Sequence, residues 1–441
     1  MIARRPRHSI MLIGAGILAV LTGGIATLAL WPQSVPPVPA TVAATVPPPP
    51  FVAVPAPPPP AALPMPQFTA FLDRLRAEAA TKGLNPATLD QAFAGLIPDS
   101  EVLDLAGVQP EYVKTAGEYL TLLVSDTRLD NGRLKLQEQA ATLTAVEATY
   151  GVDRHIVLAI WGIESNYGAG MGARRVIRSL ATLAAFETRR PDFWRGELVA
   201  ALRILQSGDT IAENMAGSWA GAMGHTQFMP STFAAHAVDF DRDGRRDIWA
   251  SIPDALGSTA NYLKVSGWVA GNPWGFEVVL PANFDFALSA PGQIKPWAQW
   301  QALGVAQARE RALPATLGPL QLLLPAGARG PAFLASANFR AILRYNNAVS
   351  YALAVGHLAD RLAGGSTFLK PWPGDDRALA KADREDLQRR LVAGGFGSGA
   401  VDGVIGSGTR AAIRAFQKAK RLPEDGHPDL ALLERLRQEV Q

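Results

Sequence analysis

The sequence Ile156-Val-Leu-Ala-Ile-Trp-Gly-Ile-Glu-Ser-Asn-Tyr-Gly168 is the most informative stretch of the chain. Its first eight residues are apolar or small, and the run ends in one carboxylate, that of Glu164. Polar residues and a glycine follow, which is typical of the end of a helix. We therefore expect a buried helix that ends near Gly168 and presents Glu164 in its last turn.

Glu164 is a candidate general acid. Apolar neighbours and the negative end of a helix dipole both disfavour an ionised carboxylate, so both raise its pKa. A carboxylic acid that stays protonated near neutral pH is what cleavage of a glycosidic bond requires. Judged by position alone, an exposed glutamate or one paired with arginine fits equally well.

A second motif is Ser218-Trp-Ala-Gly-Ala-Met-Gly-His-Thr-Gln-Phe-Met-Pro-Ser231. Its glycines and alanines let a ligand approach the backbone closely. His225 is a possible base, although a single histidine is more often structural. The motif also carries neutral hydrogen-bonding groups and aromatic rings that suit a sugar: Ser218, Gln227, Trp219 and Phe228.

A third motif, Arg344-Tyr-Asn-Asn-Ala-Val-Ser-Tyr351, lies in a helix-like stretch. Tyr345 and Asn346 could line a binding site. The simpler interpretation is a core tyrosine followed by a capping asparagine.

These motifs, together with "DALGSTANYLKVSGW" from Asp254 to Trp268, resemble the family-B lytic murein transglycosylases, glycoside hydrolase family 103. The resemblance covers roughly residues 67–365, in the same order. It implies a mainly α (α+β) fold, with a lysozyme-like α domain extended by an additional α domain. It also implies that Glu164 is the acid and base, and that the following residues bind or orient the glycan: Ser218, Gln227, Tyr262, Tyr345, Asn346, Tyr351 and Tyr119.

The resemblance implies a reaction that needs one carboxylate and no cofactor. Hydrolytic glycosidases use two carboxylates, but the second and third motifs contain none. Glu164 would protonate the oxygen between MurNAc and GlcNAc, then act as base while the MurNAc C6 hydroxyl closes a 1,6-anhydro ring. A hydrolytic muramidase and a non-catalytic peptidoglycan-binding scaffold are the alternatives.

The loop Asp239-Phe-Asp-Arg-Asp-Gly-Arg-Arg-Asp-Ile-Trp249 begins like an EF-hand calcium loop. It departs from that pattern where Ala250 replaces the final glutamate and Arg246 replaces an apolar residue. Three arginines of the loop could neutralise its acids instead of a cation: Arg242, Arg245 and Arg246. The family's version supplies the missing ligand from a later aspartate, so the candidate metal residues are Asp239, Asp241, Asp243, Arg245 and Asp254.

The folded part divides into two regions. Apolar periodicity predicts helices across residues 67–369, including one over 134–150, with strands at 276–280 and 320–324 in a small β-containing insert. Residues 377–441 resemble the small three-helix peptidoglycan-binding domain, through "GGFGSGAVDGVIGSGTRAAIRAFQKAKRLPEDG".

The N-terminal region predicts export. Residues 10–30 are uncharged and follow Arg4, Arg5 and Arg7, so residues 1–31 are a membrane anchor or a signal segment. Residues 32–66 hold 15 of the 34 prolines and form an extended linker. We expect the enzyme in the periplasm, anchored in the inner membrane if the segment is retained, with peptidoglycan strands as its partner.

Composition narrows the function further. The chain has no cysteine, which removes disulfides and thiolate chemistry. Of 42 basic residues three precede the apolar run, and the remaining 39 balance the 39 acidic ones. A nucleic-acid binder carries a basic stripe; the sequence has none, so we expect no nucleic-acid partner.

Overall fold

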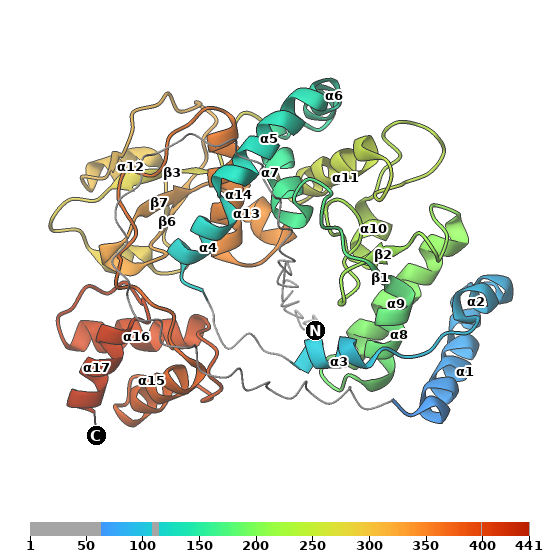
Figure 1. The fold of residues 1–441 in the computed structure, drawn as a ribbon. Coiled ribbons are helices and arrows are strands. Elements are labelled where there is room, and N and C mark those ends of the chain that lie inside the picture. Colours follow the sequence, from blue (N-terminus) through green and yellow to red (C-terminus); the bar gives the residue numbers. More distant parts are fainter. Residues whose placement is uncertain (1–62, 108–113, 398, 441) are drawn as a thin grey trace, which may run out of the picture.

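The structure is a computed structural model that describes residues 63–107, 114–397 and 399–440 (Figure 1). Four hydrophobic clusters organise these residues: two helical lobes, a small sheet and a C-terminal unit. The chain is mainly helical, as predicted.

The first helical lobe, called here the lateral lobe, lies on the right in Figure 1. Its core is built from apolar faces such as that of Phe68, Phe71 and Leu75, which recur at helical spacing on the first helix. Its helices are α1 (Met65–Thr81), α2 (Pro86–Phe93), α3 (Ser100–Gly107), α8 (Val176–Phe186), α9 (Pro191–Ser207) and α10 (Pro230–His236).

The second lobe, called here the central lobe, surrounds helix α7 (Arg154–Ser165). Every residue of α7 from Ile156 to Ser165 is buried, which explains its apolar sequence. Helix α14 contacts α7 more extensively than any other helix of this lobe does. The remaining helices of the central lobe are α4 (Ala116–Leu123), α5 (Asp126–Glu138), α6 (Ala140–Tyr150), α11 (Ile252–Val265), α13 (Ala337–Tyr345) and α14 (Val349–Leu362).

Helix α7 has a defined cap at each end. The carboxylate of Asp153 accepts the backbone N–H of His155 at the start. At the end Asn166 adopts a left-handed conformation with φ 50°, so it closes the helix two residues before Gly168.

The sheet has five antiparallel strands in the order β4-β6-β7-β3-β5. Its centre pairs β3 with β7, with Phe276 opposite Leu334. Apolar residues on one face pack with Trp300 of helix α12 (Trp297–Ala302). The strands are β3 (Gly275–Val279), β4 (Ile294–Lys295), β5 (Ala306–Gln307), β6 (Leu320–Leu323) and β7 (Ala332–Ala335).

The C-terminal unit contains α15 (Lys381–Ala393), α16 (Ser407–Ala419) and α17 (Leu430–Glu439) around its own apolar cluster. It contacts the short 3-10 helix η2 (Gly327–Arg329) beside the sheet. There the carboxylate of Asp425 accepts the N–H of Ala328 at 2.8 Å, and Arg329 pairs with Asp429 at 3.5 Å and with Asp375, which precedes the unit, at 2.7 Å.

The two predicted strands, 276–280 and 320–324, are confirmed within one residue. The single helix predicted over 134–150 is wrong: α5 ends at Glu138 and α6 begins at Ala140. This break lets α6 pack on α11 while α5 packs on α14. The N-terminal segment and most of the proline-rich linker lie outside the described residues. No helix between residues 63 and 440 that the structure describes has the length and apolarity to cross a bilayer.

Candidate active site

Glu164 lies in the last turn of α7, with only 8% of its surface exposed. Its Oε1 accepts a 2.6 Å hydrogen bond from the hydroxyl of Tyr351, near the start of α14. Burial raises the pKa of Glu164 to about 8, and the Tyr351 hydrogen bond lowers it only in part. The side chain is therefore protonated at neutral pH, as the apolar approach of the helix predicts.

Tyr119, on α4, lies close enough to sense the charge of Glu164. Burial, and then the Glu164 carboxylate, raise the pKa of Tyr119 to about 12. The same two causes hold the pKa of Tyr351 well above its ordinary value. Both phenols therefore stay protonated and can act only as neutral hydrogen-bonding groups near the carboxylate.

Tyr345 and Tyr262 lie at the junction of the two lobes, since each packs against both apolar clusters. Their rings meet edge to face at 5.1 Å, and Phe228 lies about equally close to both. The hydroxyl of Tyr345 donates to the carbonyl of Thr226, so it fixes the second motif against α13. Phe228 is buried, hence its ring supports the tyrosines rather than facing a ligand.

The second motif folds as a tight turn beside two short strands, β1 (Arg174–Arg175) and β2 (Ala216–Gly217). The Ser218 Oγ accepts the N–H of Ala222 at 3.0 Å. Gln227 adopts φ 54°, and its amide donates to the carbonyls of Met171 and Gly224. Both side chains are partly exposed, so their remaining hydrogen-bonding capacity can serve a ligand.

Asn346 caps the end of α13, directly after Tyr345. It is partly exposed and bonds through its backbone N–H to the carbonyl of Ile342 at 3.2 Å. Both sequence interpretations of this asparagine, as a cap and as a group near the site, are compatible with this position.

The sequence did not indicate which residues hold His225 in place. Its Nδ1 accepts a 3.1 Å hydrogen bond from the indole of Trp161, and burial lowers its pKa. The carbonyl of His225 accepts from the Ser165 hydroxyl at 2.5 Å. A neutral histidine held from two sides anchors the second motif to the end of α7, and no sequence signal joins these positions.

Arg128 is a second residue that the sequence did not reveal. From α5 it donates to the carbonyls of Gly162 at 3.1 Å and Leu123 at 2.7 Å. It thereby ties the last turn of α7 to the end of α4, the helix that carries Tyr119. Burial lowers the pKa of Arg128, and Tyr167 donates back to its carbonyl at 3.0 Å.

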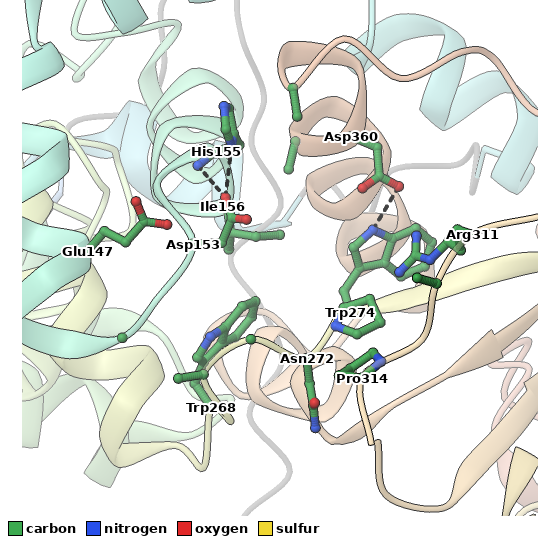
Figure 2. A pocket seen from close by; sticks show the side chains of 17 residues that line it. Glu147, Asp153, His155, Ile156, Trp268, Asn272, Trp274, Arg311, Pro314 and Asp360 are labelled. Carbon is green, nitrogen blue, oxygen red and sulfur yellow. Dashed lines mark hydrogen bonds and ion pairs between the residues drawn. The ribbon is translucent and has the colours of Figure 1, made fainter. Parts of the chain in front are cut away.

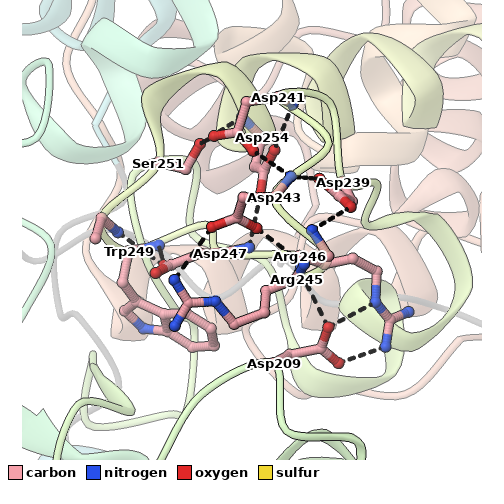
Figure 3. A network of polar contacts seen from close by, with 12 residues as sticks. Asp209, Asp239, Asp241, Asp243, Arg245, Arg246, Asp247, Trp249, Ser251 and Asp254 are labelled. Atoms are coloured by element: carbon pink, nitrogen blue, oxygen red, sulfur yellow. Dashed lines mark hydrogen bonds and ion pairs between the residues drawn. The ribbon is translucent and has the colours of Figure 1, made fainter.

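The acidic loop brings three of its candidate ligands together (Figure 3). Asp239, Asp241 and Asp254 each place one ligand atom within 4.8 Å of the others. Asp254 is fully buried and accepts the backbone N–H of Phe240 at 2.7 Å and of Asp247 at 2.8 Å, so it shapes the loop from inside.

Two of the loop arginines form ion pairs outside this group of carboxylates. Arg245 pairs with Asp243 at 3.1 Å, and Asp243 is not part of the group of three acids. Arg246 binds Asp209 through Nε at 3.0 Å and through Nη2, which ties the loop to the end of α9. No ion pair among the described residues involves Asp239, Asp241 or Asp254, and hard oxygen ligands of this kind suit calcium.

Comparison with known proteins gives two family matches. Residues 67–360 match the transglycosylase SLT domain, and residues 380–436 match the putative peptidoglycan binding domain. Among curated proteins, the membrane-bound lytic murein transglycosylase B of Escherichia coli K12 is 33% identical over 249 residues, which are 56% of this chain and 66% of that protein.

Two solved structures are informative. Pseudomonas aeruginosa SltB3, in complex with NAG-anhNAM-pentapeptide, is 52% identical with a TM-score of 0.81, covering 84% of this chain and 99% of that one. Escherichia coli lytic transglycosylase Slt35, in complex with calcium, is 29% identical with a TM-score of 0.55, covering 68% of this chain and 93% of that one.

Proposed function

The chain belongs to the family of the transglycosylase SLT domain, and we propose that it cleaves peptidoglycan at the β-1,4 bond between MurNAc and GlcNAc without water. It is a lytic transglycosylase of mainly helical, lysozyme-like fold. The observation that carries this proposal is the buried Glu164, whose pKa of about 8 keeps it protonated before the reaction.

The first step is general acid catalysis. Glu164 gives its proton to the glycosidic oxygen as the bond from C1 of MurNAc to that oxygen breaks. The GlcNAc hydroxyl leaves with this proton, and positive charge develops at C1. The Tyr351 hydroxyl is bonded to Oε1, so Oε2 is the oxygen that carries the proton.

The second step uses the same carboxylate as a base. It takes the proton of the MurNAc C6 hydroxyl while that oxygen attacks C1, so the 1,6-anhydro ring forms and Glu164 returns to its starting state. The hydrogen bond from Tyr351 stabilises the carboxylate between the two steps. Atoms balance without water, and no cofactor takes part.

One carboxylate is sufficient for this route, whereas hydrolysis uses a second one to activate water or to form a covalent intermediate. In the described part of the chain, the causes that act on the pKa of Glu164 are burial and Tyr351, and no other carboxylate is among them. This favours the lytic reaction over a hydrolytic muramidase.

The glycan is held, in this proposal, by side chains around Glu164. Ser218 and Gln227 offer polar groups from the second motif, and the partly exposed Tyr119, Tyr262 and Tyr345 offer ring faces. Tyr351 is fully buried, so it acts through its hydrogen bond to Glu164. Support comes from the placement of Tyr262 and Tyr345 at the lobe junction and from the charge coupling of Tyr119 with Glu164. The residues proposed to bind or orient the glycan are Ser218, Gln227, Tyr262, Tyr345, Asn346, Tyr351 and Tyr119.

Calcium is proposed as a structural ion. The carboxylates of Asp239, Asp241 and Asp254 would hold it, with Arg245 contributing from the loop backbone. The close approach of the three carboxylates, none of which forms an ion pair with a described residue, supports this. Asp243 pairs with Arg245, so it would join the ion only after that pair opens.

The site of action is proposed to be the periplasm, where peptidoglycan lies. Residues 1–31 would direct export and would anchor the protein in the inner membrane if they are retained. Residues 32–66 would then serve as the spacer, 67–369 as the catalytic region and 377–441 as the domain that binds the polymer.

Mass spectrometry of the products tests the reaction. Digestion of purified peptidoglycan should release muropeptides that are lighter by one water than hydrolysed ones. The Glu164→Gln variant should bind the polymer but turn over at least about a thousandfold more slowly. Products ending mainly in reducing MurNAc would identify a muramidase, and near-normal turnover by the variant would exclude Glu164 as the acid.

A further inference from the structure

A pocket of about 500 Å³ lies beside the first residues of α7 and the last residues of α14 (Figure 2). Glu164 is at the opposite end of α7. Its volume is in the range of small-molecule sites. The residues that define its chemistry are Asp153, His155, Trp268, Trp274, Arg311 and Asp360.

This pocket is separate from the proposed active site. The helices α7 and α14 run in opposite directions, with Glu164 and Tyr351 at one end and His155 and Asp360 at the other. His155 and Glu164 are nine residues apart, or roughly 13 Å along a helix. None of the proposed glycan-binding residues lines the pocket.

Two of the acids in the wall are already paired. Glu147 binds Arg154 through an ion pair. Asp153 accepts both the backbone N–H of His155 at 2.7 Å and its ring Nδ1 at 2.9 Å. These contacts already use hydrogen-bonding capacity of both carboxylates.

Asp360 and Arg311 are different, because neither forms an ion pair with any described residue. The Oδ2 of Asp360 accepts the indole N–H of Trp274 at 3.1 Å. Burial raises the pKa of Asp360 to about 6, and the charge of Arg311 lowers it in part. Arg311 is exposed at the rim, with its guanidinium 5.5 Å from the ring centroid of Phe276. An anionic and a cationic group thus face one space without neutralising each other directly.

Two tryptophans complete the wall. Trp274 is 3% exposed and Trp268 is 9% exposed, so both rings are fixed by packing. The rings therefore give the wall a fixed shape, and the Trp274 N–H holds the Asp360 carboxylate in place. In Figure 2, Asp360, Trp274 and Arg311 lie on one side of the space, with Asp153 and His155 opposite.

We propose that this pocket binds an α-amino acid group, with its ammonium at Asp360 beside the tryptophans and its carboxylate at Arg311. One carbon of such a ligand carries both charges, which matches the unpaired acid and base of the wall. Two sources share this chemistry: a free amino acid, and the free end of a diamino acid in a peptidoglycan stem peptide. Binding here does not depend on the catalytic role of Glu164.

Isothermal titration calorimetry on the full chain tests the proposal with matched probes. Meso-diaminopimelate carries the α-amino acid group, pimelate lacks the amines, and cadaverine lacks the carboxylates. We expect diaminopimelate to bind at least tenfold more tightly than either analogue, since each charged hydrogen bond contributes on this scale. The sugar-free tripeptide L-Ala-γ-D-Glu-meso-diaminopimelate separates the sources: tighter binding than the free amino acid indicates the stem peptide, and weaker binding the free form.

Variants connect the binding to the two residues. Asp360→Asn and Arg311→Gln should each weaken diaminopimelate at least tenfold, while Arg309→Gln on the same loop and the exposed Asp130→Asn should not. If Asp360→Asn lowers the melting temperature, Arg311→Gln, which changes an exposed residue at the rim, still tests the proposal. The proposal would be overturned if diaminopimelate gave no binding heat. It would also be overturned if cadaverine bound as tightly as diaminopimelate and Arg311→Gln kept the full affinity for diaminopimelate.

Discussion

The hydroxyl of Tyr351 donates a 2.6 Å hydrogen bond to Oε1 of Glu164, across 187 residues of sequence. Among the described residues, it is the one side-chain group that lowers the pKa of this carboxyl against its burial. The same contact therefore affects the pH up to which Glu164 stays protonated. It also stabilises the Glu164 carboxylate after the proton has been transferred.

Tyr351→Phe should raise the pKa of Glu164 above its present value of about 8, because the donor that favours the charged form is lost. The alkaline limb of the pH profile of kcat/KM should move to higher pH. The rate at neutral pH should fall about tenfold to a hundredfold, because the Glu164 carboxylate formed in the first step loses a charge-assisted hydrogen bond.

Tyr150→Phe is the matched control, because Tyr150 is a partly buried tyrosine of α6 without a role at the site. It should leave both rate and pH profile unchanged. A Tyr351→Phe enzyme with reduced rate but an unmoved alkaline limb would mean that Tyr351 acts on the substrate instead.

Glu164→Gln should make the folded protein more stable at neutral pH. The folded-state pKa of Glu164 is raised from 4.5 to about 8, so the native state binds the proton more tightly than the unfolded state. The free energy of unfolding of the parent protein therefore falls as the pH rises from 4.5 towards 8, by up to about 3 kcal/mol at pH 7. The amide has no such pH dependence.

Thermal unfolding at a series of pH values measures this effect. The variant should melt close to the parent at pH 4.5 and progressively above it up to pH 8. Asp130→Asn, on the surface of α5, serves as the control. Parallel melting curves at every pH would show that Glu164 is ionised in the folded state.

The sequence predicted Glu164 well because its signal is local: an apolar run before one carboxylate defines both a buried helix and a perturbed acid. The partner of Glu164 is different. Tyr351 lies on another helix, and only the family resemblance pointed to it, since periodicity does not specify which helices pack together. The break at Gln139 was missed for the same reason, because packing of α6 on α11 decides it.

The second motif illustrates another limit. Its composition suggested close approach of a ligand to the backbone but did not predict the tight turn, in which Gln227 adopts a positive φ. Composition does not say which aromatic ring is buried, and Phe228 proved to be the support under Tyr262 and Tyr345. The hydrogen bond from Trp161 to His225 joins two lobes and has no counterpart in local sequence.

Millimolar calcium should raise the melting temperature of the protein by a few degrees, because an ion that binds only the native state stabilises it. Asp241→Ala should abolish the shift, since Asp241 is an exposed member of the three-acid group. Asp192→Ala, an exposed acid of α9, should retain it. Identical melting with calcium and with EDTA would favour charge neutralisation by the loop arginines.

Deletion of residues 377–441 should separate binding of the polymer from the chemistry. This unit has its own apolar core, and none of its described residues belongs to the site around Glu164. Sedimentation with insoluble peptidoglycan should weaken at least about tenfold, because a second linked binding module raises the effective concentration of the enzyme on the polymer. Cleavage of short soluble muropeptides should change less than about twofold.

Arg329→Gln provides the control for this deletion. Arg329 pairs with Asp375 and Asp429, so the change loosens the contact with η2 while the unit itself remains. If the unit acts only as a tether, this variant should sediment with peptidoglycan like the parent, because a flexible attachment suffices for a tether. Equal losses on both substrates in the deletion, reproduced in part by Arg329→Gln, would mean instead that the docked unit shapes the catalytic region through the sheet.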